Sequence, residues 1–285
     1  MEFSDGHDDF GISILLARIK DCSERKDFLE GNRIHLEISQ RKGLFKRNLY
    51  LGSALVNMYV KCGALVKAQE VFNELLERNL ISWTALIVGY TQECNGERSL
   101  ECFERMKSEG ILPDSVTLAC TLKACGGLCA LERGQEIHTE VVKKGLSDIV
   151  VGIGNALINM YGKHGALLEA KEVLEEMLVK DVVSWTTLIA AYAKHGFFND
   201  AQECLVQMKE GGVPPNLVCW NAVISEYAEH GLGEVALQCM EKMQQESIYP
   251  DIITLTSITK ACGKAKCISR GRTTHSQIMK MGREK

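Results

Sequence analysis

A twelve-residue segment recurs three times along this chain, with a tryptophan at the same place in each copy. The copies read NLISWTALIVGY at 79–90, DVVSWTTLIAAY at 181–192 and NLVCWNAVISEY at 216–227, and the second and third lie 35 residues apart. Each is followed by a second apolar stretch that ends at a proline, namely Pro113, Pro215 or Pro250. A fixed period of this length is the signature of tandem supersecondary units, and it constrains the fold more than any other feature.

Each unit has the pattern of a helix pair. In the first copy, Trp83, Leu86 and Ile87 keep helical spacing, and Phe103 lies within a second stretch of the same period. Gly110 and the nearby proline are typical stop signals for the second helix. With 46% hydrophobic residues, 6% aromatic residues and four prolines, the composition favours an all-α protein over a β-sandwich.

Two further kinds of unit alternate with the 35-residue kind. A long kind carries K-x-C and then G-x-x-x-H, as at Lys20, Cys22, Gly31 and His35, and again at 123–138 and 260–275. A short kind reads ALVNMYVKCGALVKAQEVF at 54–72 and ALINMYGKHGALLEAKEVL at 156–174. The short unit that begins at 149 has two extra residues, which the alignment places at 153–154.

The predicted fold is an α-solenoid of about eight tandem helix-turn-helix repeats, preceded by a disordered tail over residues 1–10. A single helix pair cannot bury both of its apolar faces, so neighbouring units stack and leave a concave groove as the natural working surface. One solenoid domain is expected over 11–285, with units near 11–48, 49–79, 80–114, 115–148, 149–181, 182–216, 217–251 and 252–285.

The W-T/N-x-L-I opening and the M-K-x-x-G-x-x-P close of the 35-residue units resemble the pentatricopeptide repeat family. The alternation of standard, long and short units looks like its plant organellar PLS-type subclass, and the resemblance covers nearly the whole chain from about residue 11. A tetratricopeptide array has a 34-residue period and a W-x-x-L-G-x-x-Y pattern, which these units do not show.

The resemblance implies recognition of single-stranded RNA at one base per repeat, through the fifth residue of the first helix and the last residue of the unit. The chemistry of these side chains agrees with that reading. An Asp carboxylate only accepts hydrogen bonds, which suits the imino N–H of guanine and uracil. An Asn amide also donates, which suits the ring nitrogen acceptor of adenine and cytosine.

Carried over residue by residue, the resemblance implies a base for five units. The pairs are Ser53 with Asn79 (adenine), Thr84 with Asp114 (guanine), Asn155 with Asp181 (uracil), Thr186 with Asn216 (adenine) and Asn221 with Asp251 (uracil). In the long units, Ala119 with Asp148 and Leu16 with Asn48 match no such pair, and Thr256 has no partner in the sequence. Read 5′ to 3′, the expected order is N-A-G-N-U-A-U. The second residues Ile81, Val183 and Val218 would sandwich the base faces.

Each of these residues also has a purely structural interpretation. Ser, Thr, Asn and Asp near a helix start are commonly N-caps, and Asp or Asn beside a proline is commonly a turn residue. Their repeated occurrence at one register in five units is what favours a role in reading RNA.

One motif resembles a catalytic site. His138, Thr139 and Glu140 match the H-x-E half of the zinc nucleotide-deaminase signature, but no P-C-x-x-C follows to supply the remaining zinc ligands. His35 and Glu37 repeat the pattern at the same place in an earlier long unit, which indicates a repeat position. We therefore expect His138 to be a packing residue and the chain to have no catalytic centre.

The cysteines and the remaining histidines also follow the repeat, so we expect no metal site and no cofactor. Cysteines at equivalent positions are expected to pack in the core as small hydrophobic residues. One such set is Cys22, Cys125 and Cys262, and another is Cys102, Cys204 and Cys239. Cys62 aligns with His164, His195 and His230, without the paired spacing of a zinc site. Gly126 and Gly127 lack the Lys-Ser/Thr that follows them in a phosphate-binding loop.

Charge and composition limit the compartment and the partners. The formal net charge is −4, so RNA contact must use a local surface rather than a uniformly basic one. Twelve cysteines without a secretory signal favour a reducing compartment. No apolar run is long enough to span a membrane. The acidic start MEFSDGHDDF is unlike a transit peptide, although the resemblance implies a mitochondrion or chloroplast.

The expected function is therefore that of a specificity factor in organellar RNA processing such as C-to-U editing, with partner proteins supplying the catalysis. Two alternatives stay open: a helical scaffold that binds protein, and a truncated non-catalytic fragment.

Overall fold

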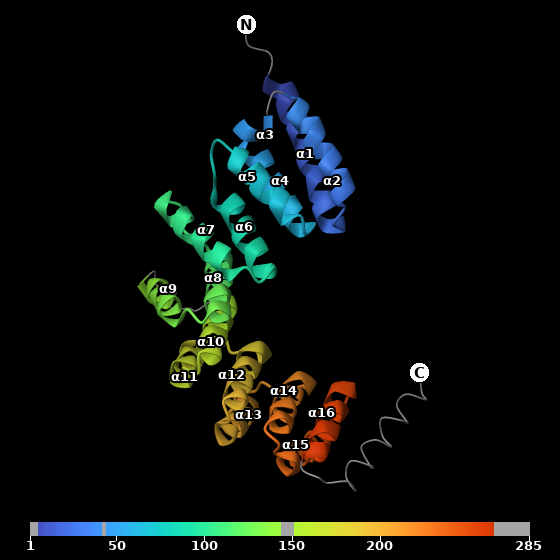
Figure 1. The fold of residues 1–285 in the computed structure, drawn as a ribbon, viewed down its shortest axis with the longest axis vertical. Helices are drawn as coiled ribbons and strands as arrows, with labels where there is room; N and C mark the ends of the chain where they lie inside the picture. Colours follow the sequence, from blue (N-terminus) through green and yellow to red (C-terminus); the bar gives the residue numbers. More distant parts are fainter. Residues whose placement is uncertain (1–4, 42–43, 144–150, 265–285) are drawn as a thin grey trace, which may run out of the picture. The chain divides into compact units, whose positions relative to one another are not determined.

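The computed structural model describes residues 5–41, 44–143 and 151–264, and the part of the chain so described is entirely helical apart from its turns. Figure 1 follows the helices in chain order, from α1 in blue to α16 in red. Their bounds are α1 Asp5–Arg25, α2 Phe28–Gln40, α3 Leu44–Arg47, α4 Leu49–Lys61, α5 Leu65–Glu74, α6 Leu80–Gln92, α7 Gly96–Ser108, α8 Ser115–Leu128, α9 Leu131–Lys143, α10 Val151–Lys163, α11 Leu167–Glu176, α12 Val182–Lys194, α13 Phe198–Glu210, α14 Leu217–Glu229, α15 Gly233–Gln245 and α16 Ile252–Lys264.

The helices form two compact units, Met1–Ile137 and His138–Lys285. In the first unit, the first helices of successive repeats pack against one another in the order α1, α4, α6 and α8, and α2, α5 and α7 each pack on the preceding first helix. In the second unit, α10, α12, α14 and α16 pack in the same way, with α11, α13 and α15 on them. Each unit therefore has two layers, one of first helices and one of second helices, as the predicted solenoid requires.

The helix pair α6–α7 illustrates why these residues adopt this structure. Asn79 and Ser82 form a reciprocal capping box that starts α6, which then buries Trp83 fully. The following helix buries its apolar stripe against α6 and ends at Ser108, and Gly110 adopts a φ of +76° there. The stop predicted at Gly110 is confirmed, because a left-handed residue ends the helix and glycine adopts it without steric cost.

Two details differ from the sequence-based expectation. Helix α1 extends back to Asp5, so residues 5–10 are helical and the tail predicted over 1–10 is wrong there; no proline interrupts this segment. Helix α10 begins at Val151, and Ile153 and Gly154 are its third and fourth residues, as Leu51 and Gly52 are in α4. The two extra residues of that repeat therefore precede α10, and their assignment to 153–154 is wrong.

Candidate nucleic-acid interface

Among the described residues, six repeats end in a residue that is the N-cap of the next first helix. Asn48, Asn79, Asp114, Asp181 and Asn216 cap α4, α6, α8, α12 and α14, and the side-chain oxygen of each accepts a hydrogen bond from the backbone N–H of the third helical residue. Asp251 does the same for α16, with Thr254 N as the donor at 2.8 Å. The structural interpretation of these residues is thus correct, since each satisfies a backbone donor that the helix cannot.

In five repeats the fifth residue of the first helix is linked by hydrogen bonds to the cap of the following first helix. Three of the predicted pairs are bonded directly. Ser53 Oγ donates to Asn79 Oδ1 at 2.9 Å, and Asn221 Nδ2 donates to Asp251 Oδ1 at 3.1 Å. The amide Nδ2 of Asn155 lies at the 3.5 Å limit from Asp181 Oδ1. The repeat period therefore brings together residues that are 26 to 30 positions apart in the sequence.

The other two pairs, those with threonine at the fifth position, are joined through a third residue. Thr84 Oγ1 lies 2.8 Å from Thr117 Oγ1, which donates to Asp114 Oδ1 at 2.7 Å. Thr186 Oγ1 lies 2.9 Å from the thiol of Cys219, which donates to Asn216 Oδ1 at 3.4 Å. In both cases the bridging residue is the third residue of the following first helix, a position that the sequence analysis did not single out.

Capping fixes which polar atom of each side chain faces the protein. All of these bonds use Oδ1 of the cap, which leaves Nδ2 of an Asn cap as a donor and Oδ2 of an Asp cap as an acceptor. Burial alone would raise the pKa of Asp251, but the hydrogen bonds from Thr254 and Asn221 outweigh it and lower the pKa below its ordinary value. The pKa of Asp181 is lowered in the same way, so both caps are carboxylates at neutral pH.

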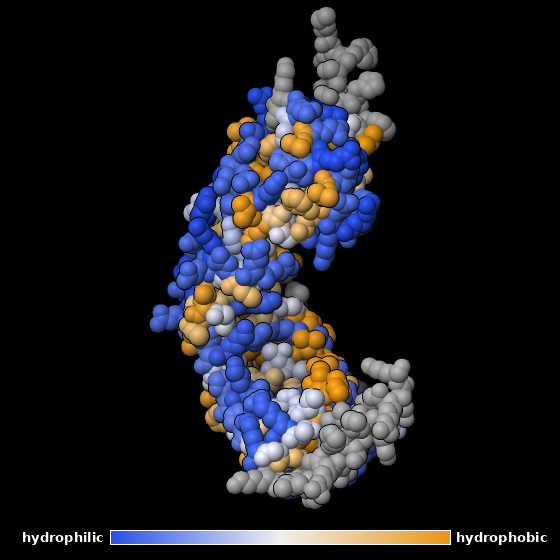
Figure 2. All heavy atoms as spheres, turned by 45° about the vertical axis from the view of Figure 1, so that its right-hand side comes forward, coloured by the Kyte–Doolittle hydropathy of each residue, from blue (hydrophilic) through white to orange (hydrophobic). Residues whose placement is uncertain are grey.

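The second residue of six first helices is a large apolar residue that is exposed. Ile81, Val183 and Val218 expose 54%, 57% and 62% of their surface. Tyr50, Val116 and Ile253 occupy the same position and are also exposed, and the sequence analysis missed them. Figure 2 shows apolar side chains of this kind as orange patches in a mainly hydrophilic surface. Counting two residues on from every cap would have found all six.

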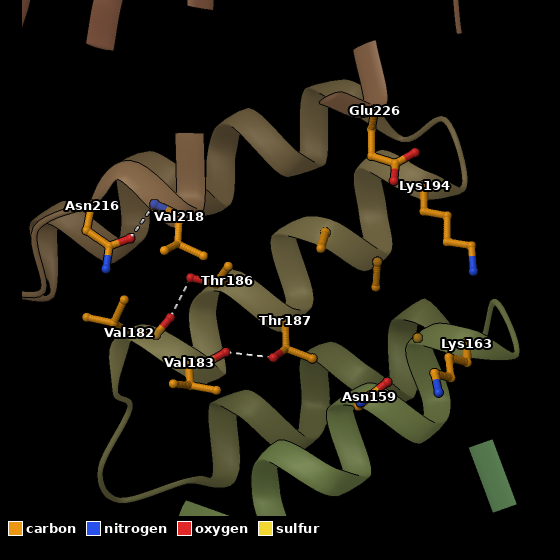
Figure 3. A pocket seen from close by; sticks show the side chains of 13 residues that line it. Asn159, Lys163, Val182, Val183, Thr186, Thr187, Lys194, Asn216, Val218 and Glu226 are labelled. Atoms are coloured by element: carbon orange, nitrogen blue, oxygen red, sulfur yellow. Dashed lines mark hydrogen bonds between the residues drawn. The ribbon is translucent and has the colours of Figure 1, made fainter. Parts of the chain in front are cut away.

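In the second unit, the exposed residues Val183 and Val218 border a pocket of about 470 Å³ between α10, α12 and α14. Figure 3 shows Val183, Thr186 and Val218 at one end of the pocket, with Asn216 beside them. The last residues of α10 and α12, Lys163 and Lys194, lie toward its other end together with Glu226. The pocket thus has an apolar clamp with a polar pair at one end and two cations at the other.

The remaining predicted positions carry no polar pair. Ala119 is half-buried on α8, and its predicted partner Asp148 lies outside the described residues. Leu16 has no polar side-chain atom to offer to Asn48, and its side chain is half-buried. Thr256 is exposed, and its hydroxyl donates to the backbone oxygen of Ile253. The long units with Leu16 and Ala119 therefore have an apolar residue at the position where the other repeats have a polar one.

The histidines of the long units connect neighbouring repeats. His35 Nδ1 lies 2.9 Å from Tyr59 Oη, and His138 Nδ1 lies 2.9 Å from Tyr161 Oη, with the rings edge-on in both cases. Burial lowers the pKa of both imidazoles. The G-x-x-x-H motif thus places a neutral histidine against the tyrosine of the next short unit, which is a packing role.

The cysteines of the two repeated sets are buried, namely Cys22, Cys102, Cys125, Cys204, Cys239 and Cys262. Burial raises the pKa of Cys102, Cys125 and Cys239 to about 11 and that of Cys204 to about 12, so these thiols are protonated and inert at neutral pH. Their predicted role in core packing is confirmed.

His195 Nε2 lies 2.8 Å from the backbone oxygen of Gly162 in the preceding repeat, which is again a structural contact. Among the described residues, no group of three or more His, Cys, Asp or Glu side chains is arranged to bind a metal ion. No helix within the described ranges has the length and hydropathy needed to cross a membrane.

The fold and this surface define an α-helical tandem-repeat protein in which stacked helix pairs present a polar pair at one register in five of the repeats. The chain matches the PPR repeat family over residues 78–127, 180–219 and 215–264, and the PPR repeat over 53–80 and 155–182. These matches cover more than half of its length. The chain therefore belongs to the pentatricopeptide repeat family.

Curated relatives from Arabidopsis thaliana agree with this assignment. One pentatricopeptide repeat-containing protein is 38% identical over 176 residues, which are 62% of this chain and 24% of the relative. A chloroplastic one is 32% identical over 70% of this chain and 32% of its own length. A mitochondrial one is 33% identical over 60% of this chain and 27% of its own length. The chain thus spans about a quarter to a third of these relatives.

Solved structures support the same fold. The crystal structure of the pentatricopeptide repeat protein PPR10 from maize superposes with a TM-score of 0.74 at 22% identity, over 94% of this chain and 38% of that one. The structure of PPR10 in complex with an 18-nt psaJ RNA element superposes with a TM-score of 0.77 at 22% identity, over 91% of this chain and 38% of that one. At this identity the comparison establishes the helical solenoid.

Proposed function

We propose that the chain binds single-stranded RNA and reads one base with each polar pair. The observation that carries this proposal is the hydrogen-bonded link between the fifth residue and the following cap at the same register in five repeats, direct in three of them and through one intervening side chain in two. Capping alone explains the last residue of each repeat, but it does not require a polar fifth residue beside it. The RNA-bound structure of PPR10 is a solenoid of the same kind, which supports RNA as the ligand.

The atoms left outward by capping give each pair a preferred base. An Asn cap such as Asn216 offers amide N–H donors, and adenine has an acceptor at its ring nitrogen. Asp caps such as Asp114 and Asp251 offer an acceptor, and guanine and uracil have an imino N–H. Because capping occupies Oδ1, it decides whether the outward atom of the cap donates or accepts a hydrogen bond to the base. The structural and functional interpretations of these residues are therefore compatible.

The exposed apolar residues and the lysines complete a binding site for a nucleotide. A base between Val183 and Val218 would bury the apolar surface that both expose, in the way that flat bases are held in single-stranded complexes. Lys163 and Lys194 carry positive charge toward the other end of the same pocket, where the phosphates of the strand would lie.

The expected order of bases is A-G-N-U-A-U, read from the repeat with Ser53 to the repeat with Asn221. We place this activity in an organelle, where the chain would act as the specificity factor of an RNA-processing event such as C-to-U editing. The names of the chloroplastic and mitochondrial relatives support that location. Partner proteins would supply the catalysis.

A binding selection tests the proposal directly. The purified chain is mixed with a pool of randomised single-stranded RNA at physiological salt, and the retained molecules are sequenced. We expect enrichment of A-G-N-U-A-U or a sequence that differs from it at one base. A chain that is folded by circular dichroism and enriches nothing would contradict RNA reading and favour a protein-binding scaffold.

A further inference from the structure

The third residue of each first helix varies with the fifth residue of the helix before it. Where the fifth residue is polar, the next third residue has a side-chain O–H or S–H group. The pairs are Ser53 with Ser82, Thr84 with Thr117, Asn155 with Ser184, Thr186 with Cys219 and Asn221 with Thr254. Where the residue at the equivalent repeat position is apolar, the next third residue is apolar as well: Leu16 precedes Leu51, and Ala119 precedes Ile153. Helix capping does not require this, because the backbone N–H of the third residue bonds to the cap whatever its side chain is.

The hydrogen bonds give the reason for the correlation. Thr117 and Ser184 each donate a hydroxyl hydrogen bond to Oδ1 of their cap, at 2.7 and 2.8 Å. The hydroxyl of Thr254 lies 2.9 Å from Oδ1 of its cap and 2.5 Å from Oδ1 of Asn221, and its single hydrogen is donated to one of these two acceptors. Thr117 and Thr254 also contact the preceding fifth residue, Thr84 or Asn221. In the repeats with Thr84 and Asn221, the third residue of the following helix thus contacts both members of the polar pair.

We propose that the third residue of the following helix is a positioning residue for base selection, and that it acts by setting the hydrogen-bond direction of the fifth residue. This inference rests on the proposed function. It concerns a residue that is fully buried, as Thr117 and Thr254 are, and that therefore acts on the RNA only through its neighbours.

The repeat with Thr84 shows how the direction is set. The carboxylate of Asp114 cannot donate, so the single hydroxyl hydrogen of Thr117 is directed at Oδ1. The oxygen of Thr117 must then accept the bond from Thr84, whose own hydrogen is directed inward. A lone pair of Thr84 is left to face the base. Thr84 and Asp114 together thus present acceptors only, which favours the N–H groups of guanine over the ring acceptor of adenine.

Removal of the Thr117 hydroxyl should release this constraint. In Thr117→Val the shape of the side chain is kept, but the hydroxyl of Thr84 is free to rotate and to donate outward. We expect the preference for guanine over adenine at this base to fall about tenfold, which is the order of one lost neutral hydrogen bond. Thr117→Ser keeps the hydroxyl and should keep the preference.

Helix α8 contains a matched control. Thr121 is also fully buried, and its hydroxyl donates to the backbone oxygen of Thr117 at 2.7 Å, away from the reading pair. Thr121→Val should therefore lower the stability of the protein about as much as Thr117→Val does. The ratio of its affinities for RNAs that differ at this base should stay that of the wild type.

The test is the binding of four RNAs that differ only at the base read by Thr84, measured for the wild type and the three variants, with thermal unfolding recorded for each. Loss of the guanine preference in Thr117→Val alone would support the inference. An unchanged ratio of guanine to adenine affinity in that variant, or an equal loss in Thr121→Val, would overturn it while leaving RNA reading intact. A wild-type chain that distinguishes no base at any position would instead overturn the proposed function, and the inference with it.

Discussion

Asn221 donates a hydrogen bond from Nδ2 to Oδ1 of Asp251 over 3.1 Å, although 30 residues separate the two in sequence. Thr254 contacts both of them, so the three side chains form one network. Replacement of Asn221 by Thr would recreate the arrangement of Thr84, Thr117 and Asp114 in the earlier repeat. We predict that Asn221→Thr shifts the preference at that base from uracil to guanine by about tenfold. RNAs that differ only at that base measure the shift, and unchanged selectivity there would refute the assignment of repeats to bases.

The two lysines of the pocket should bind every RNA alike. Lys163→Ala and Lys194→Ala each remove a charge from the end of the pocket opposite the valines. We expect weaker binding to all sequences, with the slope of log affinity against log salt reduced by roughly 0.7 per lysine. Titrations at several salt concentrations measure the slope. Lys242→Ala, an exposed lysine on the second helix α15, is the matched control and should leave the slope unchanged.

The histidine contacts between repeats should make stability depend on pH. Burial lowers the pKa of His138 in the folded chain below that of the unfolded chain, where it is about 6.5. Below pH 6.5 the imidazole of His138 binds a proton more readily in the unfolded chain than in the folded one. The free energy of unfolding is therefore highest above pH 6.5 and decreases as the pH falls from 6.5 through the lower pKa of the folded chain. Urea unfolding at pH 7.5 and 5.5 measures this loss. It should be smaller in His138→Gln, whereas a variant with the same pH dependence as the wild type would exclude His138 as the cause.

The same histidine should have no part in binding RNA. His138→Ala leaves Tyr161 Oη without its partner and opens a small cavity beside α9, so we expect a loss of about 1 to 3 kcal/mol in stability. Affinity for RNA should stay within a few fold of the wild-type value when it is measured well below the unfolding temperature. A loss of binding in a folded variant would reveal a role that packing does not explain.

One turn is under steric strain that a single substitution should relieve. Cys94 adopts a φ of +57° between α6 and α7, where the equivalent turns of other repeats have Gly63, Gly165, Gly196 and Gly231. A left-handed conformation costs a residue with a Cβ roughly 1 kcal/mol. We predict that Cys94→Gly raises the free energy of unfolding by about that amount. Cys94→Ala removes the thiol and keeps the strain, so it should not be stabilised, and chemical denaturation distinguishes the two.

Many features of the fold could be predicted from the sequence because its units repeat. The period of the tryptophans predicted helix pairs, the glycine at 110 predicted a helix end, and the equivalence of the cysteines predicted that they are buried. These three features depend on residues within one unit or on the recurrence of those residues. They are therefore determined by local conformational preferences. The register of the candidate pairs also came from the sequence, by resemblance to a known family.

Tertiary packing decided what each of these residues contacts. Trp83 and Trp220 share one register, yet Trp83 Nε1 donates to Glu109 at 3.1 Å whereas Trp220 Nε1 is buried with no partner among the described residues. The equivalent glutamate, Glu246, is instead paired with Lys209 of the preceding repeat. The hydrogen bonds by which Thr117 and Cys219 bridge their neighbours likewise became apparent only in the structure. Such contacts join neighbouring repeats, so they depend on how one helix pair stacks on the next, which no single repeat encodes.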